Sequence, residues 1–432
     1  MFRYNPPSGY RLPAQPYSSF GYDGNLWVPG LLGKMRSVMP GGVRGFLRQA
    51  AKRCYTNGAV ASTPTDFYNV RMFNTTYETV SQVQVGFPAW YDAGAGETSI
   101  TGTLTVQAYW QWAGSSVVTP LSFQGGNAVG TKSAGNVATD DMVIHSDLCN
   151  IPPGKGKFFL NYYLKNVTTG QIPFGLFNTS GAGYVAGGDA VATGANVAQN
   201  GAFADAGIAE TFFLWPSYIA AIVSGHIPAY GIWGDSRCCS EGGIVLSTTG
   251  DIGEVPRGIG GAIAQGVAGG GVPYLNTSRA GASALATTIN EHVQRALLLN
   301  RFCDRILFDL GTNDFVAGQT AAQVEANRAI IQGYTPGKLF YPTTVSPRTT
   351  SSDSWATAGN QTVLASEAQR TTYNNNLLAT GTVTYGFIGN LKPFNEVAAG
   401  KWLTNGAANY PTNDGVHGSG AINQTISLVL PA

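Results

Sequence analysis

The chain has 432 residues, of which 57 are glycine and only 11% carry a charge, and its formal net charge is +1. This length exceeds that of most single domains, and a glycine-rich, weakly charged composition is typical of a loop-rich, β-rich protein. The balanced charge gives no reason to expect nucleic acid or an anionic membrane as a partner.

Targeting and metal-binding patterns are absent from the sequence. The first residues lack a charged segment followed by an apolar run, and no later stretch of about 18 apolar residues occurs, so we expect no membrane span and see no signal peptide. An extracellular, cell-surface or virion-associated location is favoured, by a route of export that the sequence does not display. The five cysteines form no CxxC pair, and we expect neither a metal nor a cofactor.

Residues 1–55 form a basic N-terminal extension. They contain eight Lys or Arg residues against Asp23 alone, which gives this segment a net charge of +7. We interpret it as a solvated extension with a short basic helix near 45–53, and a docking arm is the alternative.

Between residues 56 and 225 the apolar residues alternate with a period of two. The clearest case is 99–112, where one side carries Ile100, Leu104, Val106, Ala108, Trp110 and Trp112. Shorter runs of this kind occur at 69–73, 83–87, 157–164 and 211–219. Such strands predict an all-β sandwich domain, jelly-roll-like, over 56–225. The stretch 181–207 has few large apolar residues and predicts a long surface loop.

After about residue 226, short apolar runs alternate with helical patterns. Strands are predicted at 229–233, 272–275, 306–310, 339–345 and 383–388, and helices at 284–302, 321–332 and 361–378. The second helix opens with a capping box from Thr320 to Gln323. This alternation predicts a doubly wound, mostly parallel sheet in an α/β three-layer, flavodoxin-like domain at 226–432. The whole chain is therefore expected to be multidomain.

Polar segments follow three of these strands. The first strand runs into GDS at 234–236, the second into NTSRAG at 276–281 and the third into GTND at 311–314. Near the C-terminus, DGVH at 414–417 adds a carboxylate and an imidazole. Ligands of such sheets bind outside the carboxyl ends of the strands, so these segments mark the expected site.

Taken in order, the four segments resemble the sequence blocks of the SGNH (GDSL-type) hydrolases. Those blocks are GDS with the nucleophile, a block with an oxyanion glycine, GxND, and a late DxxH. The resemblance covers about residues 227–432. One departure is Gly418, where many members of the family have proline after the histidine.

The resemblance implies a serine esterase with a catalytic triad of Ser236, His417 and Asp414. The chemistry of the residues supports the same roles, because a serine hydroxyl is a weak nucleophile and needs a base such as His417. Asp414 can then fix the imidazole tautomer and stabilise the imidazolium. The resemblance also implies an oxyanion hole made by the Ser236 N–H, the Gly281 N–H and the Asn313 side-chain amide.

Other polar residues near these blocks have structural interpretations. We expect Asp235 and Asp314 to hold their loops by hydrogen bonds to backbone N–H groups, and Cys238 to pack as a small apolar residue. Arg279 has two interpretations, a contact to an anionic or sugar substrate and a salt bridge within its loop. The histidines outside the blocks are expected to be structural, namely His145, His226 and His292.

These features predict hydrolysis of a carboxylic ester through an acyl-enzyme. A β-rich part before an SGNH part resembles the layout of some carbohydrate O-acetyl esterases, so the expected substrate is an acetylated glycan on a carbohydrate or cell-surface polymer. Trp90 and Tyr91 are candidates for stacking on sugar rings, and filling of the core is the alternative. The alternative function is a virion or tail-associated structural, glycan-binding protein with an SGNH module. The sequence leaves the assembly state open, and a homo-oligomer or a larger surface or virion assembly is possible.

Overall fold

The computed structural model describes the part of the chain that follows: residues 37–38, 44–49, 58–62, 67–92, 94–176, 190–193, 198, 212–213, 216–223, 227–238, 271–379, 389–397, 399–419 and 422. Most of the basic extension lies outside these residues. The strand expected at 383–388 and most of the loop expected at 181–207 also lie outside them. Residues 190–193 of that stretch form a strand, so the loop prediction is wrong there.

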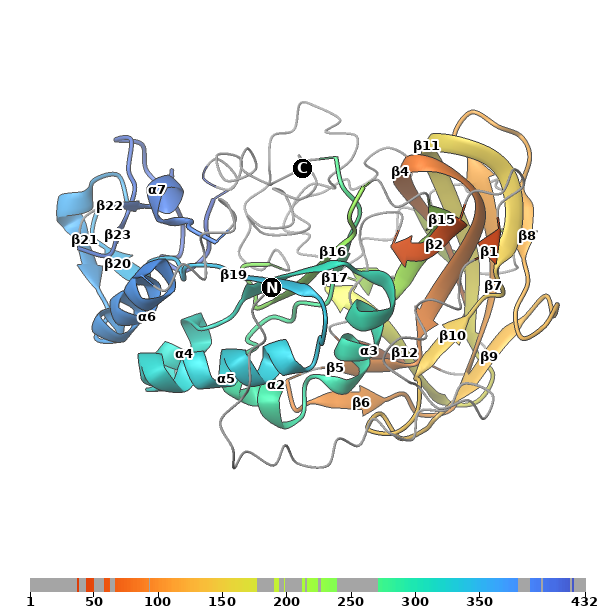
Figure 1. The fold of residues 1–432 in the computed structure, drawn as a ribbon, viewed down its shortest axis with the longest axis horizontal. Helices are drawn as coiled ribbons and strands as arrows, with labels where there is room; N and C mark the ends of the chain where they lie inside the picture. The colour runs from red at the N-terminus through yellow and green to blue at the C-terminus, as the bar shows by residue number, and fades with distance from the viewer. Residues whose placement is uncertain are drawn as a thin grey trace.

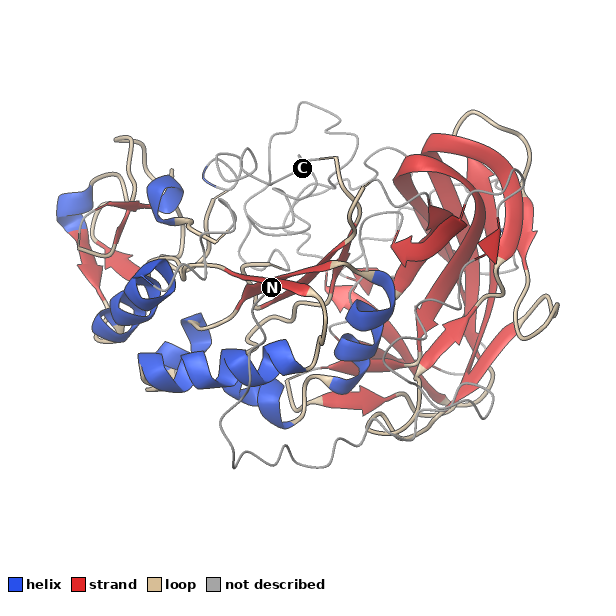
Figure 2. Cartoon of the chain, in the orientation of Figure 1, coloured by secondary structure: helices blue, strands red, loops and turns tan. Residues whose placement is uncertain are grey.

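Antiparallel strands build the first half of the described chain (Figures 1 and 2). The main sheet has the order β1-β2-β15-β4-β11-β7-β8, with β10 and β13 paired to β4 and β9 paired to β7. Its strands are Ser37–Val38 (β1), Arg44–Gln49 (β2), Phe67–Pro88 (β4), Thr103–Trp112 (β7), Thr119–Leu121 (β8), Gly130–Ser133 (β9), Val143–His145 (β10), Cys149–Asn166 (β11), Ala190–Thr193 (β13) and Tyr218–Val223 (β15).

A second, smaller sheet has the order β14-β12-β3, and β5 and β6 form a separate hairpin. These strands are Gly58–Ser62 (β3), Trp90–Asp92 (β5), Glu97–Ser99 (β6), Gly170–Leu176 (β12) and Phe212–Phe213 (β14). The first half is therefore rich in β structure, and its arrangement as a sandwich stays a prediction.

The predicted alternation is confirmed in β7. Leu104, Val106, Ala108 and Trp110 are buried, and the residues between them are partly exposed. Trp112, expected on the buried side, is partly exposed. The two runs predicted at 69–73 and 83–87 belong to one long strand, β4, which pairs with β11. Trp110 stacks on Phe158 with ring centroids 3.8 Å apart. Trp90 is only 2% exposed and belongs to the core, which confirms the core-filling interpretation for that residue.

The short basic helix expected near 45–53 is wrong, because β2 occupies 44–49. This strand pairs antiparallel with β15, from Ala220 opposite Gln49 to Val223 opposite Phe46. Strand β15 is buried along its whole length, so the backbone groups at both of its edges need hydrogen-bond partners. Strand β4 supplies them at one edge and β2 at the other. Pairing within the sheet thus outweighs the local helical preference of the segment.

A parallel sheet with the order β17-β16-β18-β19 forms the centre of the second half. Its strands are Tyr230–Gly234 (β16), Tyr274–Asn276 (β17), Arg305–Asp309 (β18) and Leu339–Pro342 (β19). Four of the five predicted strands are thus confirmed, with shifted ends. In chain order the arrangement is 2-1-3-4, which is the start of the flavodoxin-like order 2-1-3-4-5. The complete three-layer arrangement stays a prediction.

Helices lie along one face of this parallel sheet (Figure 1). They are Ala284–Ile289 (α2), Val293–Phe302 (α3), Thr312–Val316 (α4) and Ala321–Gly333 (α5), and Glu367–Ala379 (α6) follows later in the chain. Gly231 lets α3 pack closely on β16, since a Cβ at this position would lie 2.3 Å from Leu299. Successive residues of β16, such as Ile232 and Trp233, belong to different core clusters, as expected for a strand covered on both faces.

The helix predicted at 284–302 is interrupted at 290–292, and the cause is a contact with β6. Glu97 N donates to Asn290 O at 3.0 Å, and Gln294 N donates to Glu97 Oε2 at 2.6 Å. In a continuous helix, Gln294 N would donate to Asn290 O. Here Glu97 binds both of these groups, so that hydrogen bond does not form. As a result, α3 begins anew at Val293, with its first turn against the β5–β6 hairpin.

The last predicted helix is also shorter than expected. Residues 361–363 form strand β21, and α6 begins only at Glu367. The capping box of α5 is confirmed, with reciprocal bonds between Thr320 and Gln323. The remaining elements are Thr349–Ser351 (β20), Ala358–Asn360 (η4, a 3-10 helix), Gln361–Val363 (β21), Lys392–Asn395 (α7), Glu396–Val397 (β22) and Lys401–Trp402 (β23). Within the described ranges, no helix combines the length and apolar character needed to cross a membrane.

The β-rich part and the α/β part pack against each other. One hydrophobic core cluster contains residues from both, and Tyr218 of β15 stacks on Phe302 of α3 with centroids 3.9 Å apart. Arg48 of β2 forms an ion pair of 3.0 Å with Asp304. The boundaries at 55 and 225 stay predictions.

Candidate active site

Ser236 lies directly after β16, at the carboxyl end of the parallel sheet, and is 7% exposed. Asp235 fixes the turn that carries it, because its carboxylate accepts a hydrogen bond from Arg237 N at 2.9 Å. Cys238 N closes the same turn by donating to Asp235 O at 3.0 Å. The loop-holding interpretation of Asp235 is thus confirmed.

A buried charge cluster supports this turn. Arg237 Nη2 lies 2.9 Å from Asp309 Oδ1, and Thr343 Oγ1 donates to the same oxygen at 2.6 Å. Burial alone would lower the pKa of Arg237, but Asp235 and Asp309 raise it, so the guanidinium stays charged. Burial, followed by the charge of Asp309, raises the pKa of the Cys238 thiol well above its ordinary value. Cys238 is therefore a buried, protonated thiol, in agreement with its packing interpretation.

His417 reaches Ser236 from the C-terminal segment. Its Nε2 lies 2.8 Å from Ser236 Oγ, and its Nδ1 lies 2.6 Å from Asp414 Oδ2. Burial alone would raise the pKa of Asp414, but hydrogen bonds from the His417 ring and from the N–H groups of Val416 and His417 hold it well below its usual range. An ionised Asp414 favours a proton on Nδ1, which leaves Nε2 free to accept from the serine hydroxyl. The three predicted triad residues are thus brought together.

The loop at 412–418 fixes this pair through its backbone. Gly415 N donates to Thr412 Oγ1 at 2.9 Å, and Gly415 O accepts from Trp402 Nε1 at 3.1 Å. Gly415 has a φ of 78°, and a Cβ at this position would lie 1.8 Å from Thr349 O. Both the conformation and the space therefore require glycine here.

Gly281 lies in a tight turn, residues 279–282, after β17. Ala282 N donates to Arg279 O at 3.1 Å, and Gly281 occupies the third position of the turn with a φ of 74°. A positive φ at this position is that of a type II turn, which favours glycine. Arg279 N donates to Gly234 O at 3.1 Å, so the turn is attached to the end of β16.

Asn313 lies in α4, close to the end of β18. Its Nδ2 donates to Ala282 O at 2.8 Å, so its amide contacts the turn that contains Gly281. The amide nitrogen carries two hydrogens, so this bond is compatible with a second one to an oxyanion. The adjacent Asp314 accepts from Ala284 N and Leu285 N at 2.8 and 3.0 Å, which confirms its loop-holding interpretation.

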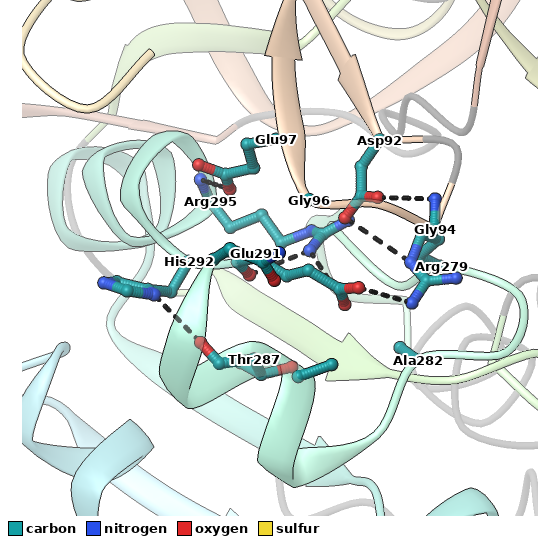
Figure 3. Close-up of polar contacts among 12 residues, drawn as sticks. Asp92, Gly94, Gly96, Glu97, Arg279, Ala282, Thr287, Glu291, His292 and Arg295 are labelled. Carbon is teal, nitrogen blue, oxygen red and sulfur yellow. Dashed lines mark hydrogen bonds and ion pairs between the residues drawn. The ribbon is translucent and has the colours of Figure 1, made fainter.

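Arg279 belongs to a buried ionic cluster between this turn and the β5–β6 hairpin (Figure 3). Its Nη2 lies 2.6 Å from Glu291 Oε1, and its Nε lies 3.4 Å from Asp92 Oδ2. Arg295 Nη2 lies 2.9 Å from the same Asp92 oxygen. These contacts confirm the salt-bridge interpretation of Arg279. No sequence pattern indicates Asp92, which is 203 positions before Arg295.

Glu97 caps helix α3 from strand β6. Its carboxylate accepts from Gln294 N and Arg295 N at 2.6 and 3.1 Å, whereas His292, at the N-cap position, makes no such side-chain bond. Burial raises the pKa of Glu97 to about 7, although Arg295 and the two backbone N–H groups act in the opposite direction. Glu97 therefore titrates near neutral pH.

The remaining histidines have structural contacts. His145 Nδ1 lies 2.6 Å from Tyr218 Oη and its Nε2 lies 2.8 Å from Asp141, and His292 Nδ1 lies 2.9 Å from a backbone oxygen. These positions confirm the structural interpretation of both residues, and His226 lies outside the described residues. In the described part of the chain, no group of three or more His, Cys, Asp or Glu side chains is placed to hold a metal ion.

Known proteins are similar to this chain in structure, whereas no family model and no curated protein matches its sequence. A carbohydrate esterase family 2 enzyme with a carbohydrate binding domain from Corynascus thermopiles (Myceliophthora fergusii) is 15% identical, with 88% of this chain and 96% of that chain covered and a TM-score of 0.29. A family two carbohydrate esterase from Clostridium thermocellum is 10% identical, with coverages of 86% and 95% and a TM-score of 0.29. A GDSL-like lipase from Bacteroides thetaiotaomicron is 15% identical, with coverages of 46% and 83% and a TM-score of 0.29.

Proposed function

We propose that this chain is a serine hydrolase that cleaves carboxylic esters, with Ser236 as nucleophile, His417 as general base and acid, and Asp414 as the carboxylate that orients the histidine. The observation that carries the proposal is the pair of contacts made by His417, 2.8 Å to Ser236 Oγ and 2.6 Å to Asp414 Oδ2. This arrangement is the one that activates a serine hydroxyl.

The proposed reaction has two halves. Ser236 Oγ attacks the ester carbonyl carbon while His417 Nε2 accepts the hydroxyl proton, and collapse of the tetrahedral intermediate transfers this proton to the departing alcohol. The acyl group then remains as an ester on Ser236. In the second half, His417 takes a proton from the attacking water and returns it to Ser236 Oγ as the carboxylic acid leaves. Asp414 stabilises the imidazolium formed in each half.

The proposed oxyanion donors are the Ser236 N–H, the Gly281 N–H and the Asn313 amide. The support for them is their attachment to the end of β16, since Arg279 N bonds Gly234 O at 3.1 Å and Asn313 bonds Ala282 O at 2.8 Å. Each donor of this kind typically lowers the barrier by about 2.7 to 4 kcal/mol.

We propose an O-acetyl ester on a carbohydrate or cell-surface polymer as the natural substrate. Its support is the order of the two parts along the chain, which resembles the layout of some carbohydrate O-acetyl esterases. The contact of Asp92 with Arg279 is further support, because it brings the β-rich part next to the proposed oxyanion hole.

Hydrolysis of p-nitrophenyl acetate and release of acetate from acetylated polysaccharide test this proposal. We expect the full chain to catalyse both reactions and His417→Ala to abolish both. Activity on the small ester alone would support the esterase and reject the polymer substrate. Activity on neither would favour the alternative, a virion or tail-associated structural protein that binds glycan.

A further inference from the structure

We infer that Asp92, a residue of the β-rich part, is a positioning residue for the oxyanion hole and acts through Arg279 to orient the Gly281 N–H. This inference rests on the proposed function, in which that N–H is a donor to the oxyanion. It assigns the β-rich part a role in the reaction itself, separate from any binding of a polymer.

The Arg279 side chain contacts the turn in which this residue lies. Arg279 Nη1 donates to the carbonyl oxygen of Ala280. In a trans peptide unit, a carbonyl oxygen and the N–H of the next residue lie in one plane and point in opposite directions. The guanidinium that holds the Ala280 oxygen therefore also sets the direction of the Gly281 N–H.

The turn does not set this direction by itself. Rotation of the peptide unit between the second and third positions converts a type II turn into a type I turn, and glycine at the third position accepts both. Here that unit joins Ala280 to Gly281, and the φ of 74° at Gly281 is that of the type II form. The Arg279 contact favours this form, because the rotated carbonyl would point away from the guanidinium.

Two carboxylates lie against the guanidinium of Arg279. Arg279 is 8% exposed, and its Nη2 and Nε lie 2.6 Å from Glu291 and 3.4 Å from Asp92. Figure 3 shows the guanidinium between these two carboxylates. A guanidinium is planar and rigid, so the hydrogen bond to Glu291 and the ion pair with Asp92 together restrict where its remaining nitrogen lies, which is the one that contacts Ala280.

Asp92 is fixed independently of the turn. It is fully buried, its Oδ1 accepts from Gly94 N at 2.8 Å, and its Oδ2 lies 2.9 Å from Arg295 Nη2. Glu291, by contrast, lies in the short connection between α2 and α3, on the same side of the interface as the turn. Asp92 is thus the group through which the β-rich part holds Arg279.

Glu97 provides a matched control on the same hairpin. It lies opposite Asp92 in the β5–β6 register and is also a buried carboxylate. It contacts the α/β part through Gln294 N and Arg295 N at the start of α3, at 2.6 and 3.1 Å. Glu97→Gln therefore perturbs the same interface at helix α3, whereas Asp92→Asn perturbs it at Arg295 of α3 and also at the oxyanion turn.

The test compares these two variants in the full chain, using p-nitrophenyl acetate kinetics and amide hydrogen exchange measured by mass spectrometry. We expect Asp92→Asn to lower kcat at least about tenfold with KM changed less than about twofold, because the misplaced donor acts in the transition state. In this variant, amide hydrogen exchange should also accelerate at Ala282, because the Ala282 N–H closes the turn. Glu97→Gln should keep kcat within about twofold and accelerate exchange only at the start of α3.

Arg279→Lys is the second variant, because it leaves Asp92 paired with Arg295 and removes only the rigid fork. We expect it to show the same kcat loss and the same exchange at Ala282. Unchanged kcat and unchanged exchange in the Asp92 and Arg279 variants would overturn the inference, and so would equal kcat losses in Asp92→Asn and Glu97→Gln. A wild-type chain without esterase activity would refute the proposed function, and exchange at Ala282 would then decide whether Asp92 holds the turn.

Discussion

Among single residues, Asp414 makes hydrogen bonds whose directions set the state of His417. Its Oδ1 accepts from the N–H groups of Val416 and His417 at 2.8 and 2.9 Å, and its Oδ2 faces His417 Nδ1 at 2.6 Å. In Asp414→Asn, the oxygen would keep the backbone bonds and the NH₂ group would face Nδ1. The imidazole would then carry its proton on Nε2 and could not accept from Ser236.

We therefore expect Asp414→Asn to lower kcat for p-nitrophenyl acetate roughly 10³- to 10⁴-fold while the chain stays folded. Steady-state kinetics with circular dichroism as the folding control measures this. Turnover close to wild type in a folded variant would remove Asp414 from the proposed triad.

Asn313 offers a second prediction at this scale. If its amide donates to the oxyanion, Asn313→Ala should lower kcat about a hundredfold or more with a smaller change in KM, because the bond strengthens in the transition state. The two constants measured with the same ester decide the point. A loss confined to KM would assign Asn313 to substrate binding instead.

The triad candidates were predictable because each belongs to a short block with a fixed spacing, and their contacts in the structure agree with that prediction. Asp92 and Glu97 were not, because they follow no local pattern and their partners lie 203 and 197 positions later in the chain. For Arg279, the sequence left two interpretations open, and the ion pair with Asp92 decides between them.

At the scale of elements, the loop that carries Asp414 and His417 depends on Gly415. A Cβ at this position would lie 1.8 Å from Thr349 O, whereas a Cβ at Gly406, also at positive φ, would have nothing within 4 Å. Gly415→Ala should therefore lower both Tm and kcat, and Gly406→Ala should lower Tm slightly and leave kcat unchanged. Equal kcat values for the two variants would show that the loop tolerates the displacement.

Helix α3 and its cap from Glu97 give a pH-dependent prediction. Burial raises the pKa of Glu97 from 4.5 to about 7, with Asp92 adding to the rise and Arg295 opposing it. Because the folded state holds this proton more tightly, the contribution of Glu97 to stability is full below pH 4.5 and is lost as the pH rises through about 7. The loss amounts to roughly 3 kcal/mol.

Comparison of Tm between pH 4.5 and 8 for wild type and Glu97→Gln isolates this contribution. The glutamine cannot ionise, so we expect its Tm to fall less than that of the wild type as the pH rises. Parallel curves for the two proteins would contradict the pKa that burial gives Glu97.

Elements were predictable where local pattern and tertiary contacts agree, as in β7, β16, β18 and α5. They were not predictable where a distant segment supplies the hydrogen bonds. Strand β2 forms because β15 needs a partner, and the break between α2 and α3 forms because Glu97 binds the backbone groups of Asn290 and Gln294. Neither cause is visible within a window of neighbouring residues.

At the scale of the whole molecule, the switch from alternating strands to a parallel sheet was visible in the sequence, but the extent of contact between the two parts was not. Tyr218 stacks on Phe302, and Met142 N donates to the Gln294 side chain at 3.0 Å. With the buried ion pair between Asp92 and Arg295, these contacts join one part to the other across α3. Removal of the β-rich part would expose apolar surface and leave buried charges without partners.

We therefore expect the full chain to unfold in a single calorimetric transition, and a chain that begins at Gly225 to lose activity on p-nitrophenyl acetate as well as on acetylated polysaccharide. Two resolved transitions, or a soluble shortened chain with the full small-ester rate, would show that the parts are independent. If the shortened chain lost activity only on acetylated polysaccharide, the role of the β-rich part would be substrate binding alone.

The proposed function requires that Ser236 is an activated nucleophile. Intact-mass analysis after treatment of the folded chain with a fluorophosphonate probe measures this, with Ser236→Ala as the control. We predict one added probe mass on the wild type and none on the variant, because His417 activates this hydroxyl. An unlabelled wild type, or equal labelling of the two proteins, would show that Ser236 is not an activated nucleophile.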